Sequence, residues 1–246
     1  MIYGHRTILW FAGIAGAVLM QGCAGTSGGS LGGSYDLSDY LFPDRSGTLL
    51  YKHYVAEQPK GTGSFGKEEY QDDVQYAVIH EGTKITVTGR ENRDAIRVYT
   101  IGSSTITVEE KEADLVYHLD RTADKVENLI HESTIKQWRE DNGDVAITYE
   151  CNVTDHLESM NIEPDPKQYT DVLKMACLRQ RTISATVGDK RFETVVETNE
   201  ENYYAKDQGM IQSTATRCEF TRVDKVETSE DGCTKDIFKI WAFVAD

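Results

Sequence analysis

Residues 135–149, IKQWREDNGDVAITY, contain the clearest signal for a β-hairpin in the chain. The pair Asn142-Gly143 tolerates the two positive φ angles of a type I′ turn, whose twist matches that of paired antiparallel strands. On either side, residues 135–138 and 145–149 supply the apolar and β-branched side chains typical of strands. We therefore predict a hairpin here, and an antiparallel sheet built around it.

Segments of the same kind lie on both sides of this hairpin. They are short, rich in Val, Ile, Thr and Tyr, and separated by Gly, Asn or Asp turns. No long helices are expected between these segments. The segments therefore predict a mainly β fold with little helix, in which a curved antiparallel sheet forms an open barrel or a sandwich. The expected strands are residues 48–56, 74–80, 84–88, 95–101, 105–109, 114–119, 170–178, 182–187, 191–198, 202–205, 210–220 and 237–244.

Two segments fit this pattern less well. Residues 125–138 are interpreted as a helical turn or two followed by a strand, because only the first half has helical spacing of apolar residues. Residues 155–167 are predicted to be a loop, since Pro164 and Pro166 cannot donate to a β-ladder. The β-rich domain is therefore expected over residues 35–246, with two possible halves that meet near 153–168.

The first 22 residues have the features of a signal peptide. Arg6 is followed by an uncharged run, residues 8–20, which is too short to cross a bilayer core of ~30 Å. The sequence that follows, LMQGCAG (19–25), resembles the bacterial lipoprotein signal at Gly22-Cys23, although Met20 and Gln21 depart from its usual residues. The alternative is an ordinary secretory signal that is cut nearby, after Gly25.

The lipoprotein resemblance implies that Cys23 becomes the first residue and carries acyl chains such as palmitate. Two or more chains anchor a protein stably, so the expected contact with the membrane is this N-terminal lipid. Ala24 resembles the residue found in the subset sorted to the outer membrane, which implies the periplasmic face of that membrane. Residues 24–34, AGTSGGSLGGS, have the composition of a flexible tether with a reach of roughly 15–20 Å.

The exported part is strongly acidic. From Cys23 onward it carries 25 basic and 41 acidic residues. A negative field of this size repels phosphates, so no nucleic-acid partner is expected.

Four cysteines remain in the exported part: Cys151, Cys177, Cys218 and Cys233. An even number in an exported chain indicates two disulfides. Three pairings are possible, and we favour Cys151 with Cys177 and Cys218 with Cys233, because each pair is close in sequence and would bridge neighbouring strands. No Cys-x-x-Cys motif for redox or haem chemistry occurs.

A second resemblance concerns residues 169–174 (YTDVLK) and 203–213 (YYAKDQGMIQS). They look like the C-terminal half of a group of bacterial envelope lipoproteins, mostly uncharacterised, in which a strand ending in Tyr-Ala turns at a glycine. That group has curved antiparallel sheets similar to the open barrels of lipoprotein carriers. The resemblance implies a type of fold and no active residues.

Two motif strings do not carry their usual chemistry. Residues 25–29, GTSGG, match the nucleophile motif G-x-S-x-G but lie in the tether, without the strand and helix that the motif needs. Residues 61–66, GTGSFG, match G-x-G-x-x-G, yet Lys67-Glu68-Glu69 is a poor start for a pyrophosphate-binding helix. A glycine-rich hairpin loop explains the second string better.

The remaining candidates for chemistry are polar clusters and tyrosines. Acidic residues gather around His156, but their spacing matches no metal motif, and a solvated loop is the preferred interpretation; they are Asp155, Glu158, Glu163 and Asp165. The other histidines of the domain are scattered: His53, His80, His118 and His131. Tyrosines pack across strands or line a concave binding face, notably Tyr51, Tyr54, Tyr70, Tyr76, Tyr99, Tyr117, Tyr149, Tyr203 and Tyr204.

These observations predict a membrane-anchored bacterial lipoprotein that acts without catalysis, cofactor or metal. Its expected role is that of a periplasmic binding or scaffold module, with envelope proteins as partners. The first alternative is a carrier of a lipid or another amphipathic ligand inside the curved sheet. The second alternative is a hydrolase that uses the loop carboxylates.

Overall fold

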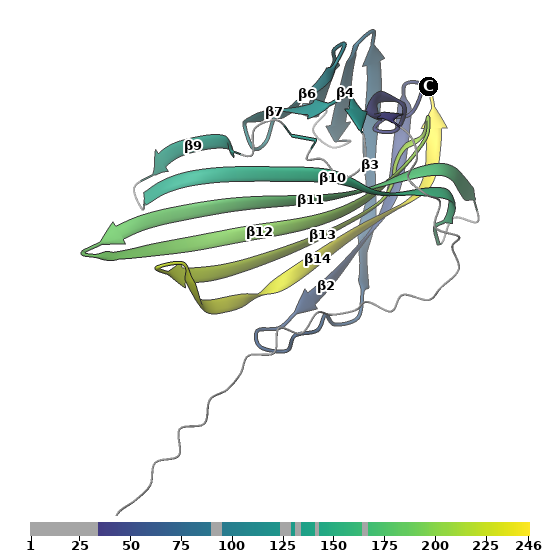
Figure 1. Ribbon diagram of the computed structural model, residues 1–246. Coiled ribbons are helices and arrows are strands. Elements are labelled where there is room, and N and C mark those ends of the chain that lie inside the picture. Colours follow the sequence, from purple (N-terminus) through teal and green to yellow (C-terminus); the bar gives the residue numbers. More distant parts are fainter. Residues whose placement is uncertain (1–33, 90–94, 124–128, 131–133, 141–142, 164–166) are drawn as a thin grey trace, which may run out of the picture.

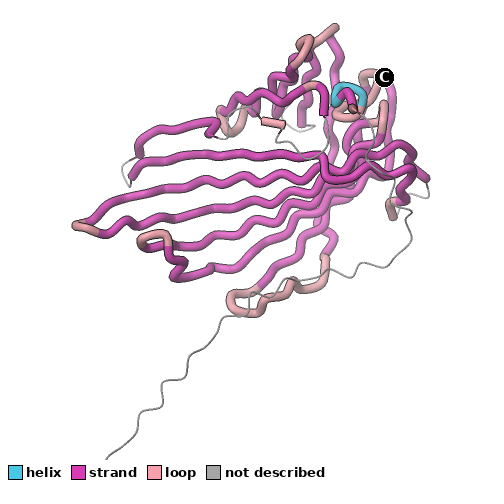
Figure 2. The backbone as a smooth tube through the Cα atoms, in the orientation of Figure 1, coloured by secondary structure: helices cyan, strands magenta, loops and turns pink. Residues whose placement is uncertain are grey.

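The computed structural model describes residues 34–89, 95–123, 129–130, 134–140, 143–163 and 167–246, except for the side chains of 228–231. Strands make up most of this part of the chain, together with one short 3-10 helix, η1 (Leu37–Asp39) (Figure 2). The shorter strands are β1 (Tyr35–Asp36), β4 (Lys84–Gly89), β5 (Ala95–Ile101), β6 (Thr105–Glu110), β7 (Leu115–Asp120), β8 (Thr122–Ala123) and β9 (Thr134–Glu140). The longer strands are β2 (Gly47–Gln58), β3 (Glu69–Glu81), β10 (Gly143–Asn161), β11 (Gln168–Val187), β12 (Lys190–Ala205), β13 (Gly209–Val223) and β14 (Val226–Ala245).

Twelve of these strands form one antiparallel sheet. Their order is β7-β6-β5-β4-β3-β2-β14-β13-β12-β11-β10-β9, so the first and last long strands of the chain pair in its middle. The sheet curves until its edge strands β7 and β9 approach each other, and the bridge between Leu119 and Ile130 lies near that seam. The prediction of a mainly β, curved antiparallel fold is confirmed, in the nearly closed form rather than as a sandwich (Figure 1).

The long strands are the main departure from the prediction. Residues 170–178 and 182–187 belong to one strand, β11, and residues 191–198 and 202–205 belong to β12. The polar residues between these predicted strands, 179–181 and 199–201, continue the ladder. Their side chains can pair across it, as Gln180 does when it donates to Glu197 over 2.7 Å. Backbone hydrogen bonds to a strand on each side hold such residues in place without an apolar face.

The loop predicted over residues 155–167 is wrong for its first half. β10 continues to Asn161, and Glu163 after it lies in a turn. His156 pairs with Leu173 within this ladder, after a bulge at Val153 to Asp155. The neighbouring strand thus determines the conformation of these polar residues. β10 and β11 pair on both sides of the bulge, up to Asn161 opposite Gln168.

Several predicted turns agree with the structure. Gly143 pairs with Glu140, which closes the hairpin of β9 and β10, although residues 141–142 lie outside the described part. The glycine-rich stretch 61–66 lies in the connection between β2 and β3. β12 and β13 turn through Asp207 (φ 60°) and Gly209 (φ 78°), a left-handed backbone that glycine adopts readily. The helical turns expected before Ile130 fall mostly outside the described residues, and the strand after them is β9.

Both expected disulfides are present. Cys151 and Cys177 are directly opposite each other on β10 and β11, with Cα atoms 4.1 Å apart. Cys218 and Cys233 occupy the same relation on β13 and β14, at 4.3 Å. The first disulfide belongs to the core, and the second joins two of the long strands.

Candidate functional site

The concave face of the sheet contains a partly open cavity of about 300 Å³. Its wall combines apolar side chains with a smaller polar group. The apolar wall includes Leu41, Phe42, Pro43, Leu49, Val78, Val87, Ile96, Leu119, Met175, Met210, Ala215, Phe238 and the disulfide Cys151–Cys177. The polar side chains are Arg97, Glu200, Asn202, Ser213 and six tyrosines.

The N-terminal segment, residues 35–43, supplies one part of this wall. Its side chains Leu37, Tyr40 and Phe42 are buried in the core of the domain. Backbone bonds tie the segment and its flank to the turn after β12, with Asp207 donating to the Asp39 carbonyl over 2.7 Å. The residues that follow the predicted tether therefore close part of the sheet interior.

A charged pair fastens the same segment. The Asp36 carboxylate accepts hydrogen bonds from Arg121 Nε at 3.0 and 2.9 Å and from the Ser38 amide at 3.0 Å. The bonds from Arg121 lower the pKa of Asp36 to about 2, from an ordinary value of 3.8. This depressed pKa means that the pair contributes stability above about pH 4, and that the contribution is lost as the pH falls through about 2.

Asp36→Asn is therefore expected to lower the free energy of unfolding by about 1 kcal/mol at pH 7, since the pair is partly exposed. The variant should also lose part of the acid sensitivity of the native chain below pH 4. Circular dichroism during acid and urea titrations measures both effects. Asp44→Asn removes an exposed carboxylate beside the segment and serves as the control. Equal acid unfolding curves for the two variants would contradict the assignment.

Six tyrosines line the cavity: Tyr51, Tyr76, Tyr99, Tyr117, Tyr149 and Tyr204. Tyr51 is almost wholly buried and donates its hydroxyl to the Met210 carbonyl over 2.6 Å. Burial raises the pKa of Tyr51, so its hydroxyl stays protonated. The rings supply apolar surface, while the hydroxyls supply hydrogen bonds. Of the other tyrosines singled out in the sequence, Tyr54 and Tyr70 pack edge to face on each other, and Tyr203 donates to Glu201.

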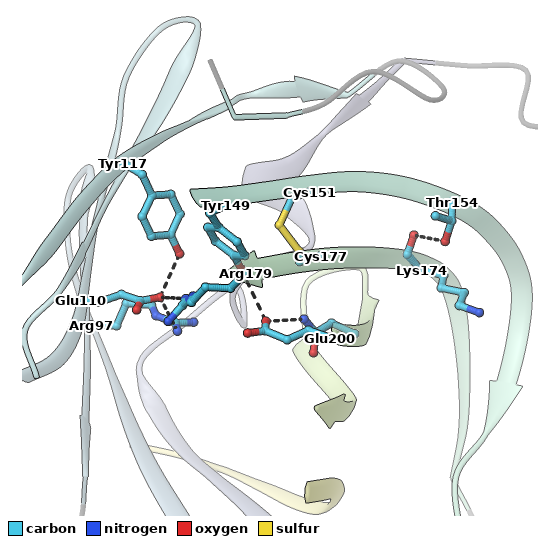
Figure 3. The surroundings of a disulfide bond; sticks show 11 residues. Arg97, Glu110, Tyr117, Tyr149, Cys151, Thr154, Lys174, Cys177, Arg179 and Glu200 are labelled. Carbon is cyan, nitrogen blue, oxygen red and sulfur yellow. Dashed lines mark hydrogen bonds and ion pairs between the residues drawn. A yellow bond between two sulfur atoms is a disulfide. The ribbon is translucent and has the colours of Figure 1, made fainter. Parts of the chain in front are cut away.

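A buried carboxylate holds two arginines together beside the cavity (Figure 3). Glu110 Oε1 accepts from Arg97 Nη2 at 2.8 Å, from Arg179 Nη2 at 2.8 Å and from the Tyr117 hydroxyl at 3.1 Å. Only 8% of the Glu110 side chain is exposed. Burial by itself would raise the pKa of Glu110, but the two guanidinium groups and the hydroxyl outweigh it and leave the pKa below its usual value.

This charged group joins opposite parts of the curved sheet. Arg97 and Glu110 come from β5 and β6, whereas Arg179 comes from β11. Arg179 also lies over the Tyr149 ring, 4.7 Å from its centroid. Glu110 is the last residue of β6, so β6 ends at this level while β11 continues to Val187. Beyond this level the long strands continue together with β9, which pairs with the start of β10 (Figure 1).

Glu200 and Asn202 continue the polar wall on β12. Glu200 Oε2 is 3.5 Å from the Tyr149 hydroxyl and 3.4 Å from Asn202 Nδ2, so both contacts are long for hydrogen bonds. Glu200 lies directly opposite Cys177 in the ladder, next to the position of Arg179. Cationic and anionic side chains thus share the polar part of the cavity.

The other sequence candidates lie elsewhere. Asp155, His156 and Glu158 are on β10, Glu163 is in the turn after it, and Asp165 lies outside the described residues. His156 Nε2 is 2.7 Å from Asp171 Oδ1, which also accepts from the Tyr40 hydroxyl at 2.8 Å. These contacts attach the N-terminal segment to β10 and β11. Cys23, His131 and the string 25–29 also fall outside the described residues. Within the described part of the chain, no three His, Cys, Asp or Glu side chains are grouped to hold a metal ion.

Sequence reasoning did not single out Arg97, Glu110 or Arg179. The sequence did contain a signal for Glu110. It follows Ile106 and Val108 at alternate positions of β6, and the side chains at these positions face the core. Arg179 follows Met175 and Cys177 on β11 in the same way. A charged residue in the apolar phase of a strand indicates a buried ion pair or a polar site.

No helix in the described part of the chain has the length and apolar character needed to span a membrane. Comparisons of the chain with protein-family models, with curated protein sequences and with solved structures found no match.

Proposed function

We propose that this protein is a lipid-anchored binding protein of the bacterial envelope that holds a small amphipathic ligand inside its curved sheet, without catalysis. The observation that carries the proposal is the cavity of about 300 Å³ with its wall of apolar side chains and tyrosines. A scaffold protein can have a fully packed interior, whereas a carrier requires an internal cavity for its ligand.

The size of the cavity limits the ligand. Ligand pockets commonly measure about 300–1,000 Å³, so this one is at the lower end of the range. The proposed ligand therefore places one short chain or one small ring in the cavity, and a triacylated lipoprotein is too large a cargo.

The chemistry of the wall defines the ligand as amphipathic. Phe42, Leu49 and Val78 give the cavity an apolar surface, while Arg97, Glu200 and the tyrosine hydroxyls can orient a polar group. A ligand with one apolar and one polar end matches both parts. The lipid anchor at Cys23, proposed from the sequence, would place the N-terminal segment nearest the membrane, because the tether leads directly into it.

Binding of a protein partner at a sheet edge is the second candidate function. Among the described strands, β7 and β9 each have only one ladder partner, and an open edge accepts an added strand. This mode predicts binding that does not depend on the cavity. The hydrolase alternative has weaker support, because Asp155 and Glu158 lie on strand β10 and Glu163 lies in the turn after it.

A substitution inside the cavity tests the proposed function. Ala215 lines the cavity on β13, and Ala215→Phe is expected to weaken binding of octan-1-ol at least tenfold by occupying the space. Thr214→Phe places the same ring on the opposite face of the same strand and should leave binding unchanged. Isothermal titration calorimetry measures the affinity, and mass spectrometry of the native protein identifies a co-purified ligand. Equal binding by both variants would contradict a cavity site.

A further inference from the structure

We infer that the ligand of this cavity carries an anionic headgroup, a carboxylate or a phosphate, which Arg97 recognises. The inference rests on the proposed function and specifies the class of ligand. It comes from Arg97, which lines the cavity, from Arg179 and Glu110 beside it, and from the hydrogen-bonding groups of Arg97 that this arrangement leaves unused.

Arg97 combines an inward position with access to the cavity. It lines the cavity, and 39% of its side chain is accessible although its strand position faces the sheet interior. Nη2 donates to Glu110 at 2.8 Å and Nη1 donates to the Tyr99 hydroxyl at 3.2 Å. These two bonds fix the plane of the guanidinium, so that it is oriented before a ligand arrives.

The charges of this group do not cancel. One carboxylate, Glu110, serves two guanidinium groups, and all three of its described contacts are to Oε1. The trio of Arg97, Arg179 and Glu110 therefore carries one net positive charge. Because an arginine cannot lose its proton in a protein, this charge is permanent.

The number of unused hydrogen-bond donors also favours an anionic ligand. Two guanidinium groups offer ten N–H donors, and the contacts found among the described residues use three of them. The Nε atoms of Arg97 and Arg179 are buried and lack an acceptor in the described part of the chain. A ligand cannot reach these two Nε atoms, but the accessible part of Arg97 lies at its other atoms, where an anionic headgroup would supply acceptors and the opposite charge.

Of the acidic side chains nearby, Glu200 on β12 acts on the trio, because its charge reaches Arg179. Asp72 and Asp236 both contact His53, at 3.0 Å from Nδ1 and 2.9 Å from Nε2, and so form a separate bridge between β3, β2 and β14. Glu200 is the remaining carboxylate on the wall. It repels an anion, and so it confines the headgroup to the side of the cavity where Arg97 and the Tyr99 hydroxyl lie. Because Arg97 and Glu200 carry opposite charges, removing one or the other should change the affinity for an anionic ligand in opposite directions.

Four probes with the same eight-carbon chain separate charge from hydrophobicity: octanoate, octyl phosphate, octan-1-ol and octylammonium. We expect octanoate or octyl phosphate to bind the full chain roughly ten- to a hundredfold more tightly than octan-1-ol, the gain typical of a charged hydrogen bond. Octylammonium should bind least tightly. Isothermal titration calorimetry measures all four affinities, and the tighter of the two anions identifies the headgroup as carboxylate or phosphate.

Two variants of opposite sign complete the experiment. Arg97→Gln should reduce binding of the anions to about the level of octan-1-ol, and a circular dichroism spectrum like that of the native chain shows that the variant is folded. Glu200→Gln should tighten binding of the anions severalfold, because it removes a repulsion. Binding of octan-1-ol as tight as that of the anions would overturn the inference while the proposed function stands. Preference for octylammonium, lost in Glu200→Gln, would also overturn it. Failure of all four probes to bind would instead contradict the proposed function.

Discussion

Glu110→Gln is expected to lower the free energy of unfolding by about 3–5 kcal/mol, the usual cost of removing one partner from a buried ion pair. The variant leaves two guanidinium groups close together with no anion between them, on strands that meet only across the sheet interior. Urea denaturation followed by tyrosine and tryptophan fluorescence measures the loss. Because these strands pack around the cavity, the variant should also weaken ligand binding.

The neighbouring residue on the same strand provides the control. Glu109→Gln removes the same charge from a more exposed position, beside Lys111, and should cost less than about 1 kcal/mol. In an Arg179→Met background, the effect of Glu110→Gln should shrink, since fewer positive charges are left unpaired. A loss below about 1 kcal/mol for Glu110→Gln would show that the trio does not hold the two walls together.

The same carboxylate gives the stability a pH dependence. The pKa of Glu110 is lowered in the folded chain, so its contribution to stability is complete above its unfolded pKa of about 4.5. The contribution is then lost as the pH falls through the folded pKa. Glu110→Gln should consequently flatten the acid limb of the stability curve, whereas Glu109→Gln should leave the limb as it is.

Cys23→Ala is expected to move the protein from the membrane fraction to the soluble fraction of the cell envelope. The proposed anchor consists of acyl chains on this cysteine alone, and the acidic domain behind it is repelled by anionic head groups. Fractionation of cells and mass spectrometry of the mature N-terminus measure the change. The expected shift is nearly complete, because two or more acyl chains bind a membrane stably and no chain remains in the variant.

A second substitution in the signal separates the anchor from general effects on export. Gln21→Ala makes the sequence before Cys23 more similar to the lipoprotein signal, and so it should preserve both lipidation and membrane binding. Unchanged membrane retention of Cys23→Ala, with an unmodified N-terminus in the native protein, would refute the anchor. An intact leader on a protein found in the cell interior would do so as well.

Local chemistry explains how much of the fold follows from the sequence. The hairpins at Gly143 and Gly209 and the loop 61–66 were predictable, because glycine and its neighbours determine turns over a few residues. The pairing of Cys151 with Cys177 was predictable on similar grounds, because two nearby cysteines on consecutive strands can be placed opposite each other. Strand lengths were less predictable. The ladder partners of residues 179–181 and 199–201 stabilise an extended backbone that their own side chains do not favour.

The sequence by itself determined an antiparallel β domain, its two disulfides and the acidic charge that disfavours nucleic acid, because these depend on composition, spacing and period-two patterns. Only the tertiary structure decided that the sheet curves around a cavity and that Glu110 meets Arg179, 69 residues away in the chain. Pairing of β2 with β14 and the approach of β7 to β9 set that curvature, and both join distant segments. Alternation along a strand tells which side chains share a face, but not what stands opposite that face. The cavity and its charged wall therefore form only when the sheet curves, because the sequence of one strand does not indicate which distant strand will face it.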